Sequence, residues 1–117
     1  MVRDQVGCPT SAYEFSLAIW KMPSHILQGI YHWANLGSGT RYDFATEIAR
    51  TANELGLLRS EWQINAVTSA DYKSRANRPP YSVLDASALA TVLGVQPSSW
   101  QHALRRDMAR GGSTLAR

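Results

Sequence analysis

The fold is decided by one stretch, Arg78-Pro79-Pro80-Tyr81-Ser82-Val83-Leu84-Asp85-Ala86-Ser87-Ala88-Leu89-Ala90-Thr91-Val92-Leu93-Gly94. Each proline fixes its own φ angle and pushes the residue before it towards extended geometry. Arg78 therefore lies on a stiff segment and has little backbone freedom to lose when it binds a ligand. Its planar guanidinium suits a phosphate group, although a solvated surface arginine is the simpler interpretation of the residue alone.

The second half of this stretch predicts a short helix. Asp85 is a suitable N-cap, and Leu89, Val92 and Leu93 fall on one helical face. Gly94 follows at the position where a glycine usually ends a helix. The residues between Arg78 and Asp85, including Tyr81, read as a short extended run.

Length and composition indicate one globular domain. The chain has 117 residues, of which 44% are hydrophobic and 18% charged, with a formal net charge of +3. A mildly basic chain suits an anionic partner without choosing between nucleic acid and nucleotide. Cys8 is the only cysteine, which excludes an internal disulfide framework and favours a reducing, cytoplasmic location. No apolar run is long enough to span a bilayer, and no signal peptide is evident.

The N-terminal half predicts a strand and two helices. Ser11 and Glu14 have capping-box spacing and open a helix that Pro23 stops. This helix should turn one apolar face inwards, made by Phe15, Ala18, Ile19 and Met22. The aromatic and branched run at residues 29–35 predicts a strand. A glycine-rich connection, residues 36–40, then leads into a helix at residues 42–55.

The C-terminal half continues with a second strand and a last helix. Residues 64–68 predict the strand. Ser98 and Gln101 repeat the capping-box spacing, and the helix that follows should bury a stripe formed by Trp100, Ala103, Leu104 and Met108. We expect residues 1–109 to form the domain and residues 110–117, which include a Gly-Gly-Ser run, to be a flexible tail.

Four segments together resemble the C-terminal part of the dTDP-4-dehydrorhamnose reductases, which are extended short-chain dehydrogenases. They are Asp4-Gln5 with Gly7 and Pro9-Thr10, then Gly29-Ile30-Tyr31-His32 with Asn35, Gly37-Ser38 and Tyr42-Asp43-Phe44-Ala45, then Arg78-Pro79 with Ser82-Val83-Leu84-Asp85, Ser87 and Leu89, and last Gly94 with Trp100. The resemblance runs from Val2 to Met108.

This resemblance implies a small α/β substrate domain of short strands and packed helices, with the dinucleotide-binding (Rossmann) domain absent. The complete enzymes reduce dTDP-4-dehydro-L-rhamnose to dTDP-L-rhamnose with NADPH. The implied substrate-binding residues are Arg78, as the candidate for the phosphates, with Gln5, Thr10, Arg3 and Tyr81. Gln5 and Thr10 are equally well explained as turn and cap residues.

The residues of the reductase chemistry are missing from this chain. Short-chain dehydrogenases use a Tyr with a Lys four residues later, and none of the five tyrosines has that neighbour. There is no glycine fingerprint for a dinucleotide, and the three histidines lack metal-ligand spacing. We therefore expect no catalytic residue, no cofactor-binding residue and no metal ligand here. The chain alone should be inactive.

A helix-turn-helix is the alternative interpretation. Residues 89–95 and 98–106 have an apolar helix, a glycine turn and a second helix, in which Arg105 and Arg106 could meet phosphates. Helix pairs with a glycine turn are common, and a nucleic-acid-binding protein should carry a stronger basic face.

Partners follow from the resemblance. We expect this chain to bind a dTDP-sugar and the missing N-terminal dinucleotide-binding domain. We expect neither nucleic acid nor a membrane as a partner. The side chains of Ile30, Tyr31 and Trp33 are candidates for a surface that the missing domain would cover, and a homodimer through that surface is a possibility.

Overall fold

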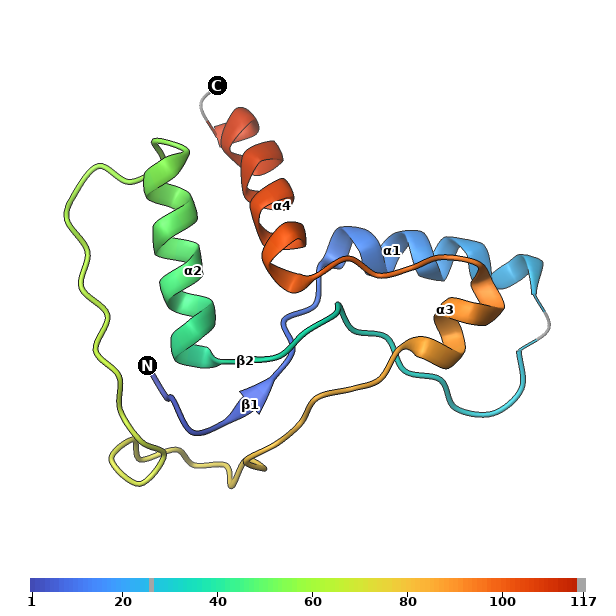
Figure 1. The fold of residues 1–117 in the computed structure, drawn as a ribbon, viewed down its shortest axis with the longest axis horizontal. Helices are drawn as coiled ribbons and strands as arrows, with labels where there is room; N and C mark the ends of the chain where they lie inside the picture. The colour runs from blue at the N-terminus through green and yellow to red at the C-terminus, as the bar shows by residue number, and fades with distance from the viewer. Residues whose placement is uncertain (26, 116–117) are drawn as a thin grey trace.

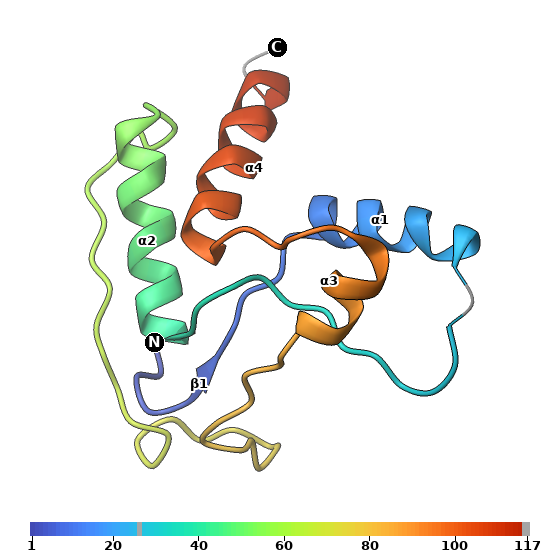
Figure 2. The same ribbon diagram turned by 45° about the vertical axis from the view of Figure 1, so that its right-hand side comes forward.

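The computed structural model describes residues 1–25 and 27–115, with side chains as far as residue 111. Its regular elements are, in chain order, β1 (Val6–Gly7), α1 (Ala12–Lys21), the 3-10 turn η1 (Met22–Ser24), β2 (Gly39–Thr40), α2 (Arg41–Glu54), α3 (Ser87–Leu93) and α4 (Trp100–Leu115). The two strands pair antiparallel. α2 and α4 lie together on one side of them, with α1 and α3 on the other (Figure 1), and a view turned by 45° keeps this grouping (Figure 2). The small α/β domain predicted from the sequence is confirmed.

The N-terminal segment, residues 1–7, is the backbone to which distant parts of the chain attach. It hydrogen-bonds to residues 39–42, 67–69 and 80–82. Within it, Val6 is paired twice, antiparallel with β2 and through a parallel bridge with the 80–82 segment. These pairings satisfy many of its backbone polar groups without a wide sheet, and within the segment only Val2 is buried.

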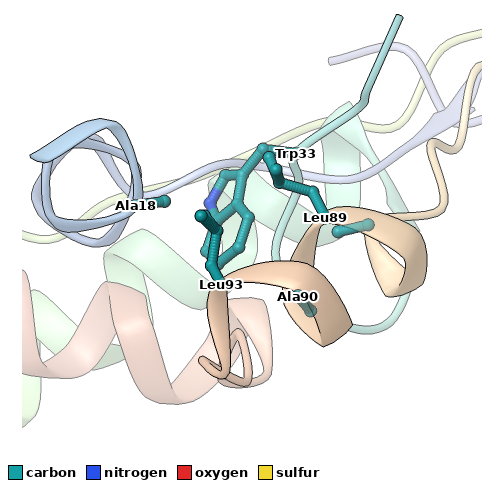
Figure 3. Close-up of a cluster of buried hydrophobic side chains, with 6 residues drawn as sticks. Ala18, Trp33, Leu89, Ala90 and Leu93 are labelled. Carbon is teal, nitrogen blue, oxygen red and sulfur yellow. The ribbon is translucent and has the colours of Figure 1, made fainter. Parts of the chain in front are cut away.

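A hydrophobic core fills the space between α1 and α3. Trp33 projects into it between Ala18 of α1 and the buried leucines of α3, Leu89 and Leu93 (Figure 3). Leu89 retains 2% of its surface and Leu93 4%. Burial of a leucine contributes ~1.5–3 kcal/mol, so α3 is held mainly by these two side chains.

The C-terminal end of α3 agrees with the prediction, but the N-terminal end does not: Ala86 is the N-cap, without a side-chain capping bond, and Asp85 lies one residue before it. The Asp85 carboxylate accepts a hydrogen bond of 2.8 Å from the Ser87 N–H, which lowers the pKa of Asp85. Gly94 has φ 65°, the left-handed conformation that a terminating glycine supplies. Val92 was predicted on the buried face but is 39% exposed. Its neighbour Leu93 takes the inward position, which rotates Val92 towards solvent.

α2 and α4 make the second layer. α2 begins with a capping box in which Thr40 and Asp43 close each other's backbone donors. The rings of Phe44 and Trp100 meet edge to face at 5.9 Å. At the other end of α2, Glu54 forms an ion pair with Arg105, which lies in the second turn of α4. Both predicted helices are therefore present, and α2 contacts the first turns of α4.

Neither predicted strand forms. Residues 31–35 are extended, but the backbone pairs only at Leu36, which bridges to Ser99. The 64–68 run pairs only at Val67, through its bridge to Val2. Residues 1–3 hydrogen-bond alongside residues 65–67, but this amounts to a single bridge and not to a strand, and the 29–35 run has no ladder partner among the described residues.

The predicted faces of α1 are partly wrong. Ala18 is buried at 1% exposure, whereas Phe15 and Ile19 are 41% and 48% exposed. α1 meets the core mainly through the small Ala18, which leaves the larger side chains on either side of it outside. In the 29–35 run, Trp33 is 9% exposed and belongs to the core, so of the three residues expected on an open surface only Ile30, at 88%, is strongly exposed.

The C-terminal helix runs further than expected. α4 continues to Leu115, so the backbone of residues 110–115, predicted as tail, is helical. Residues 116 and 117 lie outside the described residues, and the division at residue 109 stays a prediction. Within the described chain, none of the helices has the length and the apolar character that crossing a membrane requires.

Candidate functional site

Two clefts meet beside the N-terminal segment. The first, the cationic lobe, has a volume of about 480 Å³ and is lined by Val2, Gln5, Arg41, Ser69, Ala70, Tyr72, Lys73, Ser74, Arg75, Ala76, Asn77 and Arg78. The second, the apolar lobe, has about 560 Å³ and is lined by Met1, Gln5, Val6, Gly7, Cys8, Pro9, Gly39, Thr40, Arg41, Phe44, Arg78, Pro79 and Ser82. Gln5, Arg41 and Arg78 line both, so the two lobes share a boundary.

The cationic lobe carries four positive charges, from Arg41, Lys73, Arg75 and Arg78. No Asp or Glu is among the described residues that line it. Within the described part of the chain these four cations form no ion pair, because the ion pairs there use other arginines. A cleft lined by charges of one sign attracts a counter-ion, so this lobe is suited to a polyanionic ligand.

The loop that supplies Lys73 and Arg75 is fixed where it begins. Both oxygens of the Asp4 carboxylate accept a hydrogen bond of 2.9 Å from the Ser69 N–H, and one accepts a bond of 2.7 Å from the Ser69 hydroxyl. These bonds lower the pKa of Asp4. The Thr68 hydroxyl donates to Asp71 at 2.7 Å and closes the turn that follows. The loop therefore leaves the N-terminal segment from a defined geometry.

The end of the loop is fixed as well. The Val6 N–H donates to the Pro80 carbonyl at 2.8 Å, and the Val6 carbonyl accepts from the Ser82 N–H at 2.8 Å. Arg78 comes just before this paired segment and is followed by two prolines, as the sequence indicated. The exposed side chain of Arg78 thus lies at the boundary of the two lobes, and the backbone that follows it is fixed by the pairing with Val6.

The apolar lobe has a different lining. Phe44, Pro9 and Pro79 give it apolar walls, and the edge contact with Trp100 fixes the ring of Phe44. Cys8 also lines it, but its thiol donates a hydrogen bond of 2.7 Å to the Asn35 carbonyl, and burial raises the pKa of the thiol. Cys8 is therefore a protonated wall residue and is unsuited to act as a thiolate nucleophile.

The predicted substrate residues divide into two groups. Gln5 and Arg78 line both lobes, whereas Arg3, Thr10 and Tyr81 line neither. The Thr10 hydroxyl donates to the Cys8 carbonyl at 3.5 Å, which is a turn contact, and Tyr81 is 67% exposed. A role in binding stays a prediction for all five.

Sequence reasoning missed Arg41, Lys73 and Arg75. Arg41 starts α2 just after the glycine-rich connection, and only the pairing of β1 with β2 brings it to the cleft. The close spacing of Lys73, Arg75 and Arg78 in one loop was a visible signal. Three cations in six residues without an intervening acid indicate a local anion site.

A half-buried polar network outside the two lobes was also missed. The Glu14 carboxylate accepts hydrogen bonds from the Ser98 N–H at 3.2 Å, the Asn35 amide at 2.5 Å and Arg106 at 2.8 Å, and a further bond from the Ser98 hydroxyl. Burial alone would raise the pKa of Glu14, but the bonds from Ser98, Arg106 and Asn35 outweigh it and hold the pKa below its usual range. The network ties α1 to α4 and to residue 35.

This network replaces the reciprocal capping box expected at α1. The Ser11 hydroxyl does accept from the Glu14 N–H at 3.2 Å, as predicted. The Ser11 N–H, however, donates to the Asn35 side-chain oxygen at 2.7 Å, and this releases the Glu14 carboxylate for its distant partners. The last helix is likewise capped by the Ser99 hydroxyl, at 3.3 Å from the His102 N–H, because Ser98 is engaged by Glu14.

The two arginines of the helix-turn-helix alternative are occupied within the domain. Arg105 pairs with Glu54, and Arg106 pairs with Glu14 and Asp107. Arg106 also stacks over the Tyr13 ring at 5.0 Å. Their charge is therefore largely neutralised, and the helix that carries them packs on α2 instead of presenting a basic face.

The arrangement is suited to binding an anion. The side chains in the lobes are cations, amides, hydroxyls and apolar groups, together with the protonated thiol of Cys8 and the exposed phenol of Tyr72. Across the described residues, no group of three or more His, Cys, Asp or Glu side chains is placed to hold a metal ion.

Comparison with known proteins gives a consistent result. The model of the family called RmlD substrate binding domain matches residues 1–111. The spore coat polysaccharide biosynthesis protein SpsK of Bacillus subtilis is 40% identical over 97% of this chain and 37% of its own length. A dTDP-4-dehydrorhamnose reductase of Aggregatibacter actinomycetemcomitans is 34% identical over 93% of this chain and 39% of its own length.

Solved structures agree with the sequence relatives. The dTDP-4-dehydrorhamnose reductase of Clostridium acetobutylicum superimposes with a TM-score of 0.80 at 28% identity, over 99% of this chain and 38% of that protein. The Bacillus anthracis enzyme, solved in complex with NADP, gives 0.75 at 30% identity, over 90% of this chain and 34% of that protein. The chain thus spans little more than a third of the length of the proteins it matches.

Proposed function

Because the chain belongs to the family of RmlD substrate binding domains, we propose that it is the nucleotide-sugar-binding domain of a dTDP-4-dehydrorhamnose reductase. In complete form such an enzyme would reduce dTDP-4-dehydro-L-rhamnose to dTDP-L-rhamnose with NADPH. The part of the function that belongs to this chain is to hold the dTDP moiety. The names of two relatives, a dTDP-4-dehydrorhamnose reductase and a probable ketoreductase of a dTDP-linked sugar in Streptomyces antibioticus, support a dTDP-linked ligand.

The observation that carries this proposal is the unneutralised charge at the boundary of the two lobes. Arg41 and Arg78 line both lobes, and Lys73 and Arg75 add two further cations to one of them. A nucleoside diphosphate joined to a sugar is a dianion between two ring systems. Such a ligand requires cations in the middle and room on both sides, which is what this groove offers.

Reduction itself would depend on residues outside this sequence. The chain has neither a Tyr with a Lys four residues later nor a dinucleotide fingerprint. The cofactor would be NADPH bound by a separate dinucleotide-binding domain, in line with the NADP in the Bacillus anthracis enzyme. We therefore expect that this chain oxidises no NADPH when it is mixed with the keto-sugar nucleotide.

The proposal is tested by calorimetric titration of the 117-residue chain with dTDP. We expect weak saturable binding, because a ligand that a second domain normally helps to enclose loses part of its contacts here. Arg78→Ala should weaken it by ~2 kcal/mol, the scale of a lost charge-assisted pair.

The matched control is Arg59→Ala. Arg59 is an exposed arginine that lines neither lobe. The Arg59→Ala substitution removes the same charge as Arg78→Ala, so a general electrostatic effect on dTDP binding would appear in both variants. Equal dTDP affinity for wild type and Arg78→Ala would remove Arg78 from the site, and no binding by the wild type would contradict the proposed function.

A further inference from the structure

The two lobes differ in a way that defines a direction for the ligand. The cationic lobe has Lys73 and Arg75 in addition to the boundary arginines. The apolar lobe adds no Lys or Arg beyond those arginines and has Phe44, Pro9 and Pro79 in its walls. A dTDP-sugar is equally asymmetric, because a flat, methylated pyrimidine is at one end and a polar sugar at the other.

We propose that the pyrimidine and deoxyribose occupy the apolar lobe against Phe44, that the diphosphate crosses the boundary at Arg41 and Arg78, and that Lys73 and Arg75 bind its distal phosphate. The sugar then leaves through the cationic lobe. This inference rests on the proposed function and deepens it by assigning residues to each end of the ligand.

Phe44 is suited to receive a base because it is held in place before binding. It lies on the first turns of α2, and its ring meets Trp100 edge to face at 5.9 Å and 73°. Trp100 is itself 4% exposed, and its indole N–H donates to the Ser38 carbonyl at 3.4 Å. An aromatic ring fixed in this way gives up little rotamer entropy when a base packs on it.

Lys73 and Arg75 are suited to the distal phosphate because of where their loop is fixed. The bonds from Asp4 to Ser69 hold its start, and the pairing of Val6 with the 80–82 segment holds its end. Between these points the loop has only exposed side chains. The two cations therefore remain on the side of the groove away from Phe44, yet can adjust to a phosphate.

Gln5 is a third element of the boundary. Its side-chain amide lines both lobes and makes no hydrogen bond with the other described residues. An amide in this position can donate to a phosphoryl oxygen or accept from the deoxyribose hydroxyl. It supplements the arginines at the point where phosphate and deoxyribose join.

The direction is tested by comparing dTDP, dTMP and inorganic pyrophosphate on three variants of the 117-residue chain. The double variant Lys73→Ala/Arg75→Ala should weaken dTDP by about tenfold, the change that corresponds to ~1.4 kcal/mol, and leave dTMP nearly unchanged. Phe44→Leu should weaken dTDP and dTMP by the same factor and leave pyrophosphate unchanged. Arg59→Ala is again the control and should change none of the three.

Amide chemical-shift mapping on the wild type gives a second measurement that does not depend on the variants folding. We expect dTMP to shift Gly7, Gly39 and Phe44, and pyrophosphate to shift the Lys73 to Arg78 loop. The opposite assignment, or a Phe44→Leu effect on pyrophosphate equal to that on dTMP, would overturn the direction while leaving dTDP binding intact. If the wild type binds no dTDP, both the proposed function and the proposed direction of the ligand are wrong.

Discussion

Removal of the Glu14 carboxylate is the perturbation that the structure defines most sharply. Glu14 accepts from Asn35, Ser98 and Arg106, and its side chain is 12% exposed. Hydrogen bonds to a charged group contribute ~1.5–3 kcal/mol each, and loss of one partner of a buried pair costs ~3–5 kcal/mol. Because the Arg106 side chain keeps 23% exposure and can turn donors to water, we take the low end. Glu14→Ala should therefore cost about 3 kcal/mol of unfolding free energy.

The assay is urea unfolding followed by circular dichroism, with Glu61→Ala as the matched control. Glu61 is an exposed carboxylate with no ion pair among the described residues. Its removal should change stability by less than ~0.5 kcal/mol. Glu14→Gln keeps the shape and one acceptor but loses the charge, so we expect it to cost about half as much as Glu14→Ala. Equal stability of Glu14→Ala and Glu61→Ala would refute the view that this network holds α1 to α4.

The same network predicts the direction of a pH effect. The pKa of Glu14 is lowered in the folded chain from an ordinary value of 4.5. Its contribution to stability is therefore complete above that ordinary value and is lost as the pH falls through the lower, folded-state pKa. The difference between wild type and Glu14→Ala should be constant at neutral pH and shrink as the pH falls below 4.5. A difference that grows on acidification would mean that the carboxylate is not stabilised by its partners.

Two further predictions concern the loop and the surface. Asp4→Asn should speed hydrogen exchange of the Ser69 amide and weaken dTDP binding, because the bonds that fix the start of the loop are made by a carboxylate. Unchanged exchange of the Ser69 amide would show that Asp4 does not hold the start of the loop. Trp20 is 84% exposed beside Leu17 and Ile19 on α1, so we expect the chain to self-associate through this part of α1. Sedimentation over a wide concentration range should show Trp20→Ser to be less associated than the wild type, and a wild type that stays monomeric throughout would contradict the expectation.

Helix positions could be predicted because their signals are local. Ser11 and Gly94 act through neighbours one to four residues away and have the capping and terminating roles that the sequence indicated, whereas Asp85 bonds to Ser87 from the position before the N-cap, Ala86. Pairing of strands is not local. Residues 29–35 have strand composition, but a strand depends on a partner that this segment lacks, so its side chains, Trp33 above all, serve the core instead.

The candidate site was only half predictable for the same reason. Arg78 could be singled out because its two prolines follow it directly. Arg41 enters the groove only because β2 pairs with β1, and no sequence pattern announces that pairing. The polar network joins Glu14 to Ser98 and Arg106, which are 84 and 92 residues away. The capping-box spacing of Ser11 and Glu14 predicted only the local bond between those two residues.

Amide chemical-shift titration of the wild-type chain with dTDP, beside a titration with duplex DNA, tests the central claim most directly. We expect saturable shifts with dTDP that are centred on Gln5, Arg41 and Arg78, the residues common to both lobes. Duplex DNA should give no saturable shift along α4, because Arg105 and Arg106 are engaged by carboxylates of the domain. No saturable response to dTDP, or a response to DNA along α4, would contradict the assignment of this chain as a nucleotide-sugar-binding domain.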